Sequence, residues 1–414
     1  MIGSLPRLRI YTTLGQYVDV LASLVVGDRR SGDDVAKLEK EIAKRVGTAA
    51  AVAMPLARVG LYHAVKALIR PGQKVIMSPY TIADVVNMVV CAGGQPVFAD
   101  IERETCNIDA AEVERLLTAD TGAVLVTHFY GLACDIERIA AACREKGVPL
   151  IEDAAQAYGV RVNGKPVGTF GDIGVFSFGM FKNVNSFYGG AIVTNRPELA
   201  DKIRTTINQR PYQSLSMYLS KVANAAVTDI ITMPLFYRSF FFWLFRYAFI
   251  NEVESINNRM KIDVDPKLKT EIPDEYDRRM RPIQARLVLK QLDRVDRDTA
   301  ARVEHAKFYY ENLKDVKGLI MPPMRTDGSH MYWYFPIQYE NRHDLVKFAM
   351  RHGRDITESY HRNCAALPCF SQWASDCPRA QATADGLIYL PTYPRYKRSE
   401  IAKTVAVIKA YFNQ

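Results

Sequence analysis

Two side chains with complementary chemistry lie on either side of a strand-rich stretch in the middle of the chain. Asp153 ends the apolar run VPLIED, and Lys182 follows the run GVFSF and a short turn, 29 residues further along. Such a carboxylate can pair with the ring nitrogen of pyridoxal phosphate, and a lysine amine can form a Schiff base with its aldehyde. The amine can also act as general base and acid at a substrate carbon, because cationic or apolar neighbours lower a lysine pKa toward neutrality. Taken alone, the pair is more typical of a strand-end aspartate and a solvated surface lysine. Assigning the two residues to a cofactor site therefore depends on the surrounding sequence.

Seven short, mostly β-branched runs between residues 48 and 200 predict the sheet that would position these side chains. The runs are AAAVAM (49–54), KVIMSPY (74–80), QPVFADI (95–101), GAVLVTHFY (122–130), VPLIEDAA (148–155), GVFSF (174–178) and GAIVTN (190–195). Amphipathic stretches such as 58–69 and 110–118 separate most of the early runs. This alternation predicts an α/β fold with a mostly parallel sheet covered on both faces. Ligands of such sheets bind at the carboxyl ends of the strands, where Asp153 and Ser177 lie.

Composition narrows the class of protein. The chain has 414 residues, 48% of them hydrophobic, and a formal net charge of +9 that is spread along the sequence. Its length suits two domains, or one large α/β domain with an appendage. We expect no nucleic-acid partner, because no RNA- or DNA-binding motif is present. The seven cysteines include no CxxC pair, and no residues have metal-ligand spacing, so we expect no metal site. The cysteine pattern and the absence of a signal-peptide pattern predict a cytoplasmic protein.

Longer motifs around Asp153 and Lys182 resemble the DegT/DnrJ/EryC1/StrS aminotransferase family, the sugar aminotransferases of fold type I. The resemblance rests on IEDAAQAYG, GKPVGTFGDIGVFSF, Lys182 and GGAIVTN in that order, with SGDDVAKLEKEIAKRVG and PGQKVIMSPYT upstream and RRMRPIQARLVLKQLDR downstream. It implies a fold type I PLP-dependent transferase with a mostly parallel seven-stranded sheet and a smaller C-terminal α/β domain. It further implies that Lys182 binds the cofactor aldehyde, Asp153 the pyridine nitrogen and Ser177 the phosphate, with Gln156 near the ring hydroxyl.

On this resemblance we expect three parts and a homodimer with a shared active site. Residues 1–225 form the PLP-binding large domain, 226–275 an aromatic insertion and connection, and 276–414 the C-terminal small domain. A long amphipathic helix is expected over 282–313 at the start of the last part. His128 is expected in the pocket wall, and Tyr360 and Arg395 are candidate substrate ligands. For Tyr360 and Arg395, a solvated basic loop is at least as good an interpretation.

Three positions depart from the family pattern. The usual Ser-Gly-Thr phosphate turn reads Leu56-Ala57-Arg58, so Arg58 would replace a hydroxyl hydrogen bond by a charge-assisted one. Asp277 stands where an Asn normally reaches across the dimer to the phosphate, and Ile82 stands where an aromatic residue normally stacks on the ring. One hypothesis pairs Arg58 with Asp277 of opposite subunits. The alternative leaves Asp277 in solvent and gives its role to Arg278 or Arg279.

The segment 226–250 is unusual, because nine aromatic residues lie between Leu235 and Phe249. As a helix, Leu235 to Ile250 measures about 24 Å, which is too short to span a bilayer. Aromatic and basic residues together favour a helix lying on a membrane surface through Phe241, Phe242 and Trp243. That interpretation would place the enzyme on the inner face of the cytoplasmic membrane. A helix packed at a subunit interface is the alternative.

The function expected from the resemblance is transfer of an amino group from an amino acid, with glutamate as the expected donor, to a keto-sugar by a ping-pong mechanism. The keto-sugar would be nucleotide-linked or, given the aromatic segment, lipid-linked. Some family relatives carry histidine at the lysine position and are sugar dehydratases, so Lys182 favours transamination. Two alternatives stay open, a PLP-binding protein without transaminase activity and a PLP-dependent sugar dehydratase.

Overall fold

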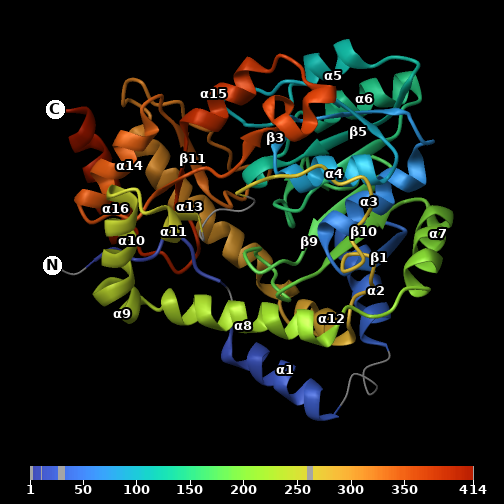
Figure 1. The fold of residues 1–414 in the computed structure, drawn as a ribbon, viewed down its shortest axis with the longest axis horizontal. Helices are drawn as coiled ribbons and strands as arrows, with labels where there is room; N and C mark the ends of the chain where they lie inside the picture. The colour runs from blue at the N-terminus through green and yellow to red at the C-terminus, as the bar shows by residue number, and fades with distance from the viewer. Residues whose placement is uncertain (1–2, 11, 27–32, 259–263, 414) are drawn as a thin grey trace.

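A seven-stranded sheet forms the centre of the larger lobe in the computed structural model, which describes residues 3–10, 12–26, 33–258 and 264–413 (Figure 1). The strand order is β1–β10–β9–β6–β5–β2–β4. Strand β10 is antiparallel to both its neighbours, and the other pairs are parallel. The mostly parallel sheet and its seven strands are therefore confirmed: β1 (Ala50–Met54), β2 (Lys74–Met77), β4 (Gln95–Phe98), β5 (Thr121–Thr127), β6 (Leu150–Asp153), β9 (Ile173–Ser177) and β10 (Gly190–Thr194).

Both faces of this sheet are buried, as the continuous apolar runs predict. Along β2, Val75 and Met77 join one hydrophobic cluster while Ile76 joins another, because successive side chains point to opposite faces. Helices α3 (Ala57–Leu68) and α4 (Ala83–Cys91) contribute to the first cluster, and α5 (Ala110–Leu116) and α6 (Ile136–Lys146) to the second.

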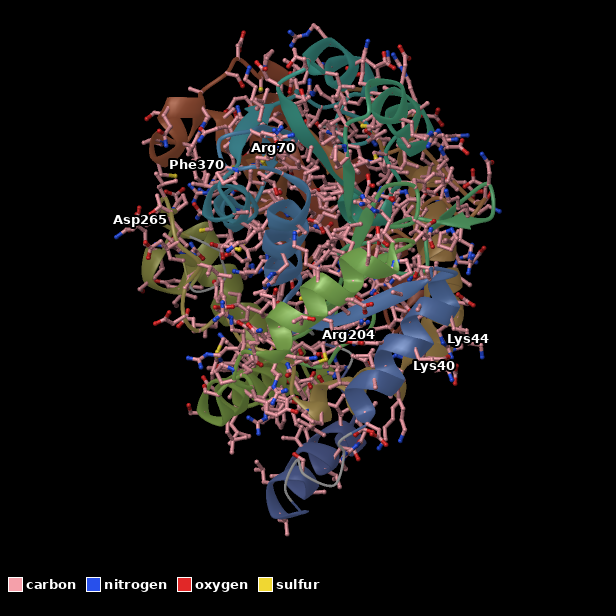
Figure 2. All side chains as sticks on the ribbon, turned by 90° about the vertical axis from the view of Figure 1, so that its right-hand side faces the viewer. Lys40, Lys44, Arg70, Arg204, Asp265 and Phe370 are labelled. Carbon is pink, nitrogen blue, oxygen red and sulfur yellow. The ribbon has the colours of Figure 1, made fainter. Side chains whose placement is uncertain are left out.

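Helices α2 (Asp34–Val46) and α7 (Pro197–Asn208) lie at the β1 end of the sheet. Arg204 of α7 donates to Glu39 of α2 at 3.0 Å and to the carbonyl of Ala51 at 2.9 Å. Figure 2 shows the two helices side by side, with Lys40 and Lys44 on the outer side of α2. The N-terminal helix α1 (Leu14–Val26) lies outside this layer, below α8 in Figure 1.

The smaller lobe is built on an antiparallel sheet with the order β11–β14–β12, formed by Phe335–Gln338, Leu387–Leu390 and Thr357–Glu358. Its core also receives α13 (Val295–Leu313), α14 (Arg342–Arg351) and α16 (Arg398–Phe412). Leu5, from the opposite end of the chain, is buried in the same cluster.

The expectation of one continuous helix over 282–313 is wrong. The segment forms α12 (Pro282–Leu289), a 3-10 turn η5 (Leu292–Arg294) and then α13. Gln291 lies at the break, where its side-chain amide donates to the carbonyls of Leu287 at 2.6 Å and Asn185 at 2.7 Å. Because of this break, α12 packs in the hydrophobic core of the large lobe, while α13 packs in the core of the small lobe.

The aromatic segment is part of a helical insert. It comprises α8 (Leu215–Ile231), α9 (Pro234–Phe236), the π-helical turn η3 (Tyr237–Phe241), α10 (Phe242–Ile250) and α11 (Glu254–Asn257). In Figure 1, α8 runs below both lobes and leads to α9 and α10 beside the small lobe. Within the part of the chain that the structure describes, no helix has the length and apolar character needed to cross a bilayer.

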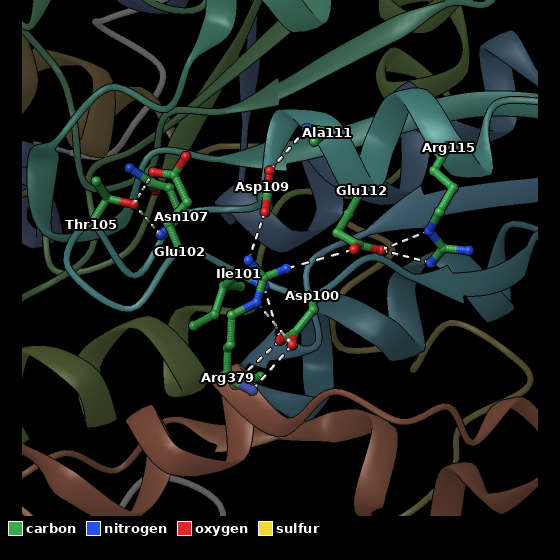
Figure 3. Close-up of polar contacts among 11 residues, drawn as sticks. Asp100, Ile101, Glu102, Thr105, Asn107, Asp109, Ala111, Glu112, Arg115 and Arg379 are labelled. Carbon is green, nitrogen blue, oxygen red and sulfur yellow. Dashed lines mark hydrogen bonds and ion pairs between the residues drawn. The ribbon is translucent and has the colours of Figure 1, made fainter.

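Shorter elements join the two lobes. Helix α15 (Pro378–Gly386) rests on the large sheet through Asp100, whose carboxylate accepts hydrogen bonds from the backbone N–H groups of Arg379, at 3.1 Å, and Ala380, at 2.9 Å (Figure 3). Arg379 also donates to Asp109 at 2.7 Å.

The remaining short elements are β3 (Tyr80–Thr81) paired with β13 (Arg362–Asn363), β7 (Arg161–Val162) paired with β8 (Lys165–Pro166), and the turns η2 (Phe129–Gly131), η6 (Cys364–Ala366) and η7 (Pro368–Trp373).

Candidate active site

Asp153 and Ser177 are brought together by neighbouring strands. Strands β6 and β9 are adjacent and parallel, with Asp153 opposite Val175, so both strands end at one edge of the sheet. The Asp153 side chain is buried, and its Oδ1 accepts a hydrogen bond from the N–H of Ala155 at 3.0 Å. Burial raises the pKa of this carboxyl, whereas that N–H and the nearby Lys182 ammonium lower it. A cationic partner would therefore stabilise the ionised form of Asp153.

The Lys182 amine lies over an aromatic ring that the sequence did not identify. Its Nζ is 4.0 Å from the centroid of the Trp333 ring, and Trp333 is itself held by a 2.9 Å hydrogen bond from Nε1–H to the carbonyl of Phe181. Desolvation lowers the pKa of Lys182 to about 8; Arg58 adds to this effect, and Asp153 opposes it. A larger share of the amine is thus uncharged near neutral pH than in an ordinary lysine.

The N-terminus of α3 lies beside Ser177. Gly190 pairs with Ser177 across β10 and β9, and a Cβ at Gly190 would come within 2.8 Å of the backbone nitrogen of Ala57. The N-cap residue Leu56 supplies no side-chain hydrogen bond to the helix. The first N–H groups of α3 and the Ser177 hydroxyl thus form a place suited to an anion.

Arg58, in the first turn of α3, belongs to a cluster with Asp84, Lys269 and Tyr276. Its Nη1 contacts the Asp84 carboxylate and also donates to the Tyr276 hydroxyl at 3.1 Å. Asp84 accepts further hydrogen bonds from Lys269 Nζ at 2.5 Å and from Tyr276 Oη at 3.2 Å. Sequence reasoning missed these three partners, although Asp84 lies two residues from Ile82 and Tyr276 directly precedes Asp277.

Asp277 has a partner in its own chain. Its carboxylate pairs with Arg210 Nε at 2.9 Å, so the interpretation of Asp277 as a solvated carboxylate is wrong. Pairing of Arg58 with Asp277 of another subunit stays a prediction, and it would have to compete with Asp84 and Arg210. Ile82 is partly buried at the start of α4 and packs on the large core.

Gln156 and His128 have different surroundings. Gln156 Oε1 accepts a hydrogen bond from the N–H of Tyr130 at 2.7 Å, which leaves its amide nitrogen as a donor group. His128 is fully buried; its Nδ1 accepts from the N–H of Cys134 at 3.2 Å, and its Nε2 bonds Glu152 at 3.2 Å. His128 is not among the described residues that line the cavity, so its expected place in the pocket wall stays a prediction.

A different histidine, His361, is buried and senses the charge of the Lys182 amine. Its Nδ1 is 2.7 Å from the Tyr389 hydroxyl, which in turn is 2.7 Å from Ser359 Oγ. Burial and, second, the Lys182 ammonium lower the pKa of His361 to about 3, so the imidazole is neutral. The buried hydroxyls of Tyr80 and Tyr130 extend this network into the large lobe.

A cavity of about 1290 Å³ begins beside these residues and extends to the aromatic insert. Phe181, Tyr334, Tyr360 and His361 line one part of it, so Tyr360 is placed where a substrate could contact it. Arg395 is not among the described residues that line the cavity; its charge acts on Asp229 of α8.

The aromatic residues of the insert divide into three groups. Phe242 has no exposed surface and packs in the small lobe's core, so the expectation that it contacts a membrane is wrong. Phe241 lines the cavity, while Trp243 is partly buried against the same core. Exposed side chains on the outer side of the insert are Leu235, Phe236, Phe240 and Tyr247.

The sequence profile of the DegT/DnrJ/EryC1/StrS aminotransferase family matches residues 16–227 and 260–409. The chain is 30% identical over 403 residues to the spore coat polysaccharide biosynthesis protein SpsC of Bacillus subtilis, covering 94% of this chain and 92% of that protein. The chain belongs to this family. It is a pyridoxal-phosphate-dependent aminotransferase, as the resemblance implied.

Two further relatives widen the comparison. The chain is 28% identical over 408 residues to a UDP-N-acetyl-3-dehydro-alpha-D-glucosamine 3-aminotransferase of Acidithiobacillus ferrooxidans, covering 97% of this chain and 94% of that protein. The crystal structure of the sugar aminotransferase CalS13 from Micromonospora echinospora superposes with a TM-score of 0.76 at 21% identity, covering 98% and 99% of the two chains. The last similarity confirms the type I fold of this family member.

The residues of this aminotransferase fit pyridoxal phosphate. Lys182 offers an amine of lowered pKa, and Asp153 offers a buried carboxylate that gains from a cationic ring nitrogen. Ser177, the N-terminus of α3 and Arg58 offer donors and positive charge for the phosphate. The donor set therefore matches the three polar parts of the cofactor, even though Arg58 replaces the usual hydroxyl.

Proposed function

We propose that this aminotransferase moves an amino group from glutamate to the carbonyl of a keto-sugar in two half-reactions. The observation that carries the proposal is the Lys182 amine, which lies 4.0 Å from the Trp333 ring centroid and has a pKa lowered by burial and by Arg58, against the effect of Asp153. The names of relatives support a sugar acceptor: one is the 3-dehydro-glucosamine aminotransferase described above, and another, 28% identical over 391 residues, is the GDP-perosamine synthase of Vibrio cholerae.

Each residue would have a defined task. Bound pyridoxal phosphate supplies an electron sink for negative charge at the substrate carbon. Asp153 would keep the ring nitrogen protonated, and Lys182 would hold the aldehyde carbon and afterwards carry a proton to and from the substrate carbon. Trp333 orients the amine from one side, while Ser177 and Arg58 would anchor the phosphate.

The glutamate half-reaction tests this proposal. Adding glutamate to the loaded protein should bleach the absorbance band of the lysine-bound cofactor and release 2-oxoglutarate. Subsequent addition of keto-sugars from a panel should restore the band for an acceptor. The Lys182→Ala variant should do neither, and Lys165→Ala, at an exposed lysine, serves as the matched control. A stable band with glutamate would indicate cofactor binding alone, and loss of water from a sugar would indicate a dehydratase.

We also propose a homodimer with a shared active site whose insert contacts a membrane surface. Leu235, Phe236 and Phe240, which are 73%, 49% and 61% exposed, support an apolar partner for the outer side of the insert. Phe240→Ser should then reduce flotation with anionic vesicles while the dimer stays intact. A broken dimer with unchanged flotation would instead assign this surface to a subunit interface.

A further inference from the structure

The cavity near Lys182 has one wall formed by a segment that the family profile does not match. The family profile matches residues up to 227 and again from 260, and the intervening segment supplies one side of the cavity. Helix α10 contributes Leu244, Phe245 and Phe249 to this wall, the turn η3 contributes Phe241, and α8 contributes Ile231. This stretch of the wall is therefore apolar and aromatic, while polar residues of the same segment, such as Glu252 and Asn257, line another part of the cavity.

One end of the same cavity lies near the reacting amine, although Lys182 is not among its described lining residues. Tyr334 lines this end, its ring centroid is 4.8 Å from that of Trp333, and the Lys182 Nζ lies 4.0 Å from the Trp333 ring. The volume of about 1290 Å³ exceeds the roughly 300–1,000 Å³ of most small-molecule pockets. A sugar at Lys182 would thus leave space between itself and α10 for a second portion of the acceptor.

Charges around the cavity argue against a diphosphate in that space. Among the described residues, the lining has three arginines, Arg7, Arg342 and Arg362, and five carboxylates, Glu252, Glu254, Asp355, Glu358 and Asp385. Asp355 pairs with Arg7 at 3.3 Å, and Glu358 lies 3.6 Å from Arg342. Because the carboxylates outnumber the arginines and face them in these pairs, the described part of the lining offers no net positive charge to a phosphate dianion.

We infer that the acceptor of this aminotransferase is a keto-sugar carrying an uncharged apolar chain, which lies against α10 while the sugar carbonyl lies at Lys182. The inference rests on the proposed function, since it names the substrate class of the same site. Burial of the chain against Leu244, Phe245 and Phe249 would supply binding energy far from the reacting carbon.

Displacement of an uncharged fluorescent probe, N-phenyl-1-naphthylamine, from the loaded protein tests the inference. Hexyl, heptyl and octyl glucosides, kept below their micelle concentrations, should displace the probe about fourfold more tightly for each added methylene. Uridine diphosphate should not displace it. Leu244→Asp and Ile256→Asp, which place a charge on the cavity wall from two different helices, should each weaken probe binding at least about tenfold. Phe240→Asp, on the exposed side of the same insert, should stay within about twofold of the wild type.

Two results would overturn the inference. One is displacement by uridine diphosphate with no effect of alkyl length, which would indicate a nucleotide-linked acceptor. The other is probe affinity that neither Leu244→Asp nor Ile256→Asp changes, which would place the apolar site elsewhere. The glutamate half-reaction, which needs no acceptor, separately tests the proposed function, so the two can fail independently.

Discussion

Arg58 and Asp84 form an ion pair at the N-terminus of α3, where the cofactor phosphate is expected. Lys269 binds the other oxygen of the same carboxylate. Burial opposes ionisation of Asp84, but the two cations outweigh it and hold its pKa below the usual value. The Asp84 carboxylate therefore neutralises positive charge on Arg58 and Lys269, which would otherwise be available to the phosphate dianion of the cofactor.

Substitutions in this pair should change cofactor affinity in opposite directions. Arg58→Ala should weaken binding of pyridoxal phosphate by about tenfold to a hundredfold, because a charge-assisted hydrogen bond is lost. Asp84→Asn should strengthen it, because Arg58 and Lys269 lose a competing anion. Titration of the apoprotein with the cofactor measures both, and Arg70→Ala, at an exposed arginine, is the control. Weaker binding in Asp84→Asn, with an unchanged melting temperature, would contradict this role for the cluster.

Reactivity of the Lys182 amine should depend on pH with a midpoint near its pKa of about 8. In the apoprotein the amine is mainly protonated below this pH and becomes nucleophilic above it. Asp153 raises this pKa and Arg58 lowers it, so Asp153→Asn should shift the midpoint down and Arg58→Ala should shift it up. Reductive methylation with formaldehyde, followed residue by residue with mass spectrometry, measures the midpoint. A midpoint above pH 10 would show that the amine is not desolvated.

Trp333 should act on the rate through the position of the amine. Loss of a ring below an ammonium group costs about 0.5–2 kcal/mol, a factor of about 2 to 30. Trp333→Ala removes both the ring under Nζ and the hydrogen bond to Phe181, whereas Trp333→Phe keeps a ring. The single-turnover rate with glutamate should therefore fall more in Trp333→Ala than in Trp333→Phe. Equal rates in the two variants would assign Trp333 a packing role only.

Asp100 and Arg379 should contribute unequally to stability, although they form one network (Figure 3). Asp100 is buried and accepts three backbone hydrogen bonds, from Ile101, Arg379 and Ala380. Asp100→Ala should cost about 2 kcal/mol or more, because these donors lose their partner. Arg379 is 38% exposed, so Arg379→Ala should cost about 1 kcal/mol or less. Denaturant unfolding measures both, and the reverse order would be inconsistent with this explanation.

Local patterns predicted the sheet, and the family resemblance assigned two residues near the ends of its strands. Strands buried on both faces are continuous apolar runs, so β6 and β9 were recognisable locally, whereas the roles of Asp153 and Lys182 came from the longer motifs around them. Trp333 lies 151 positions after Lys182, and no local pattern links two such distant positions. The break after α12 was hidden because it depends on contacts that Gln291 makes with the distant Asn185.

The aromatic insert shows the limit of composition as a guide. Nine aromatic residues indicated an apolar partner, but composition could not separate Phe242, which faces a core, from Phe240, which faces solvent. The cavity arises because α10 and residues 355–363 of the small lobe, far apart in the sequence, line the same space. A helix with aromatic residues on every side has no single face that the sequence pattern can assign.

Borohydride reduction of the loaded protein, followed by peptide mapping, tests the central claim most directly. We expect one pyridoxyl group per chain on the peptide that contains Lys182, because its amine lies over the Trp333 ring and has a lowered pKa. The label should disappear in Lys182→Ala. A label on another lysine, or no stable label after reduction, would contradict the assignment of Lys182 as the residue that holds the cofactor.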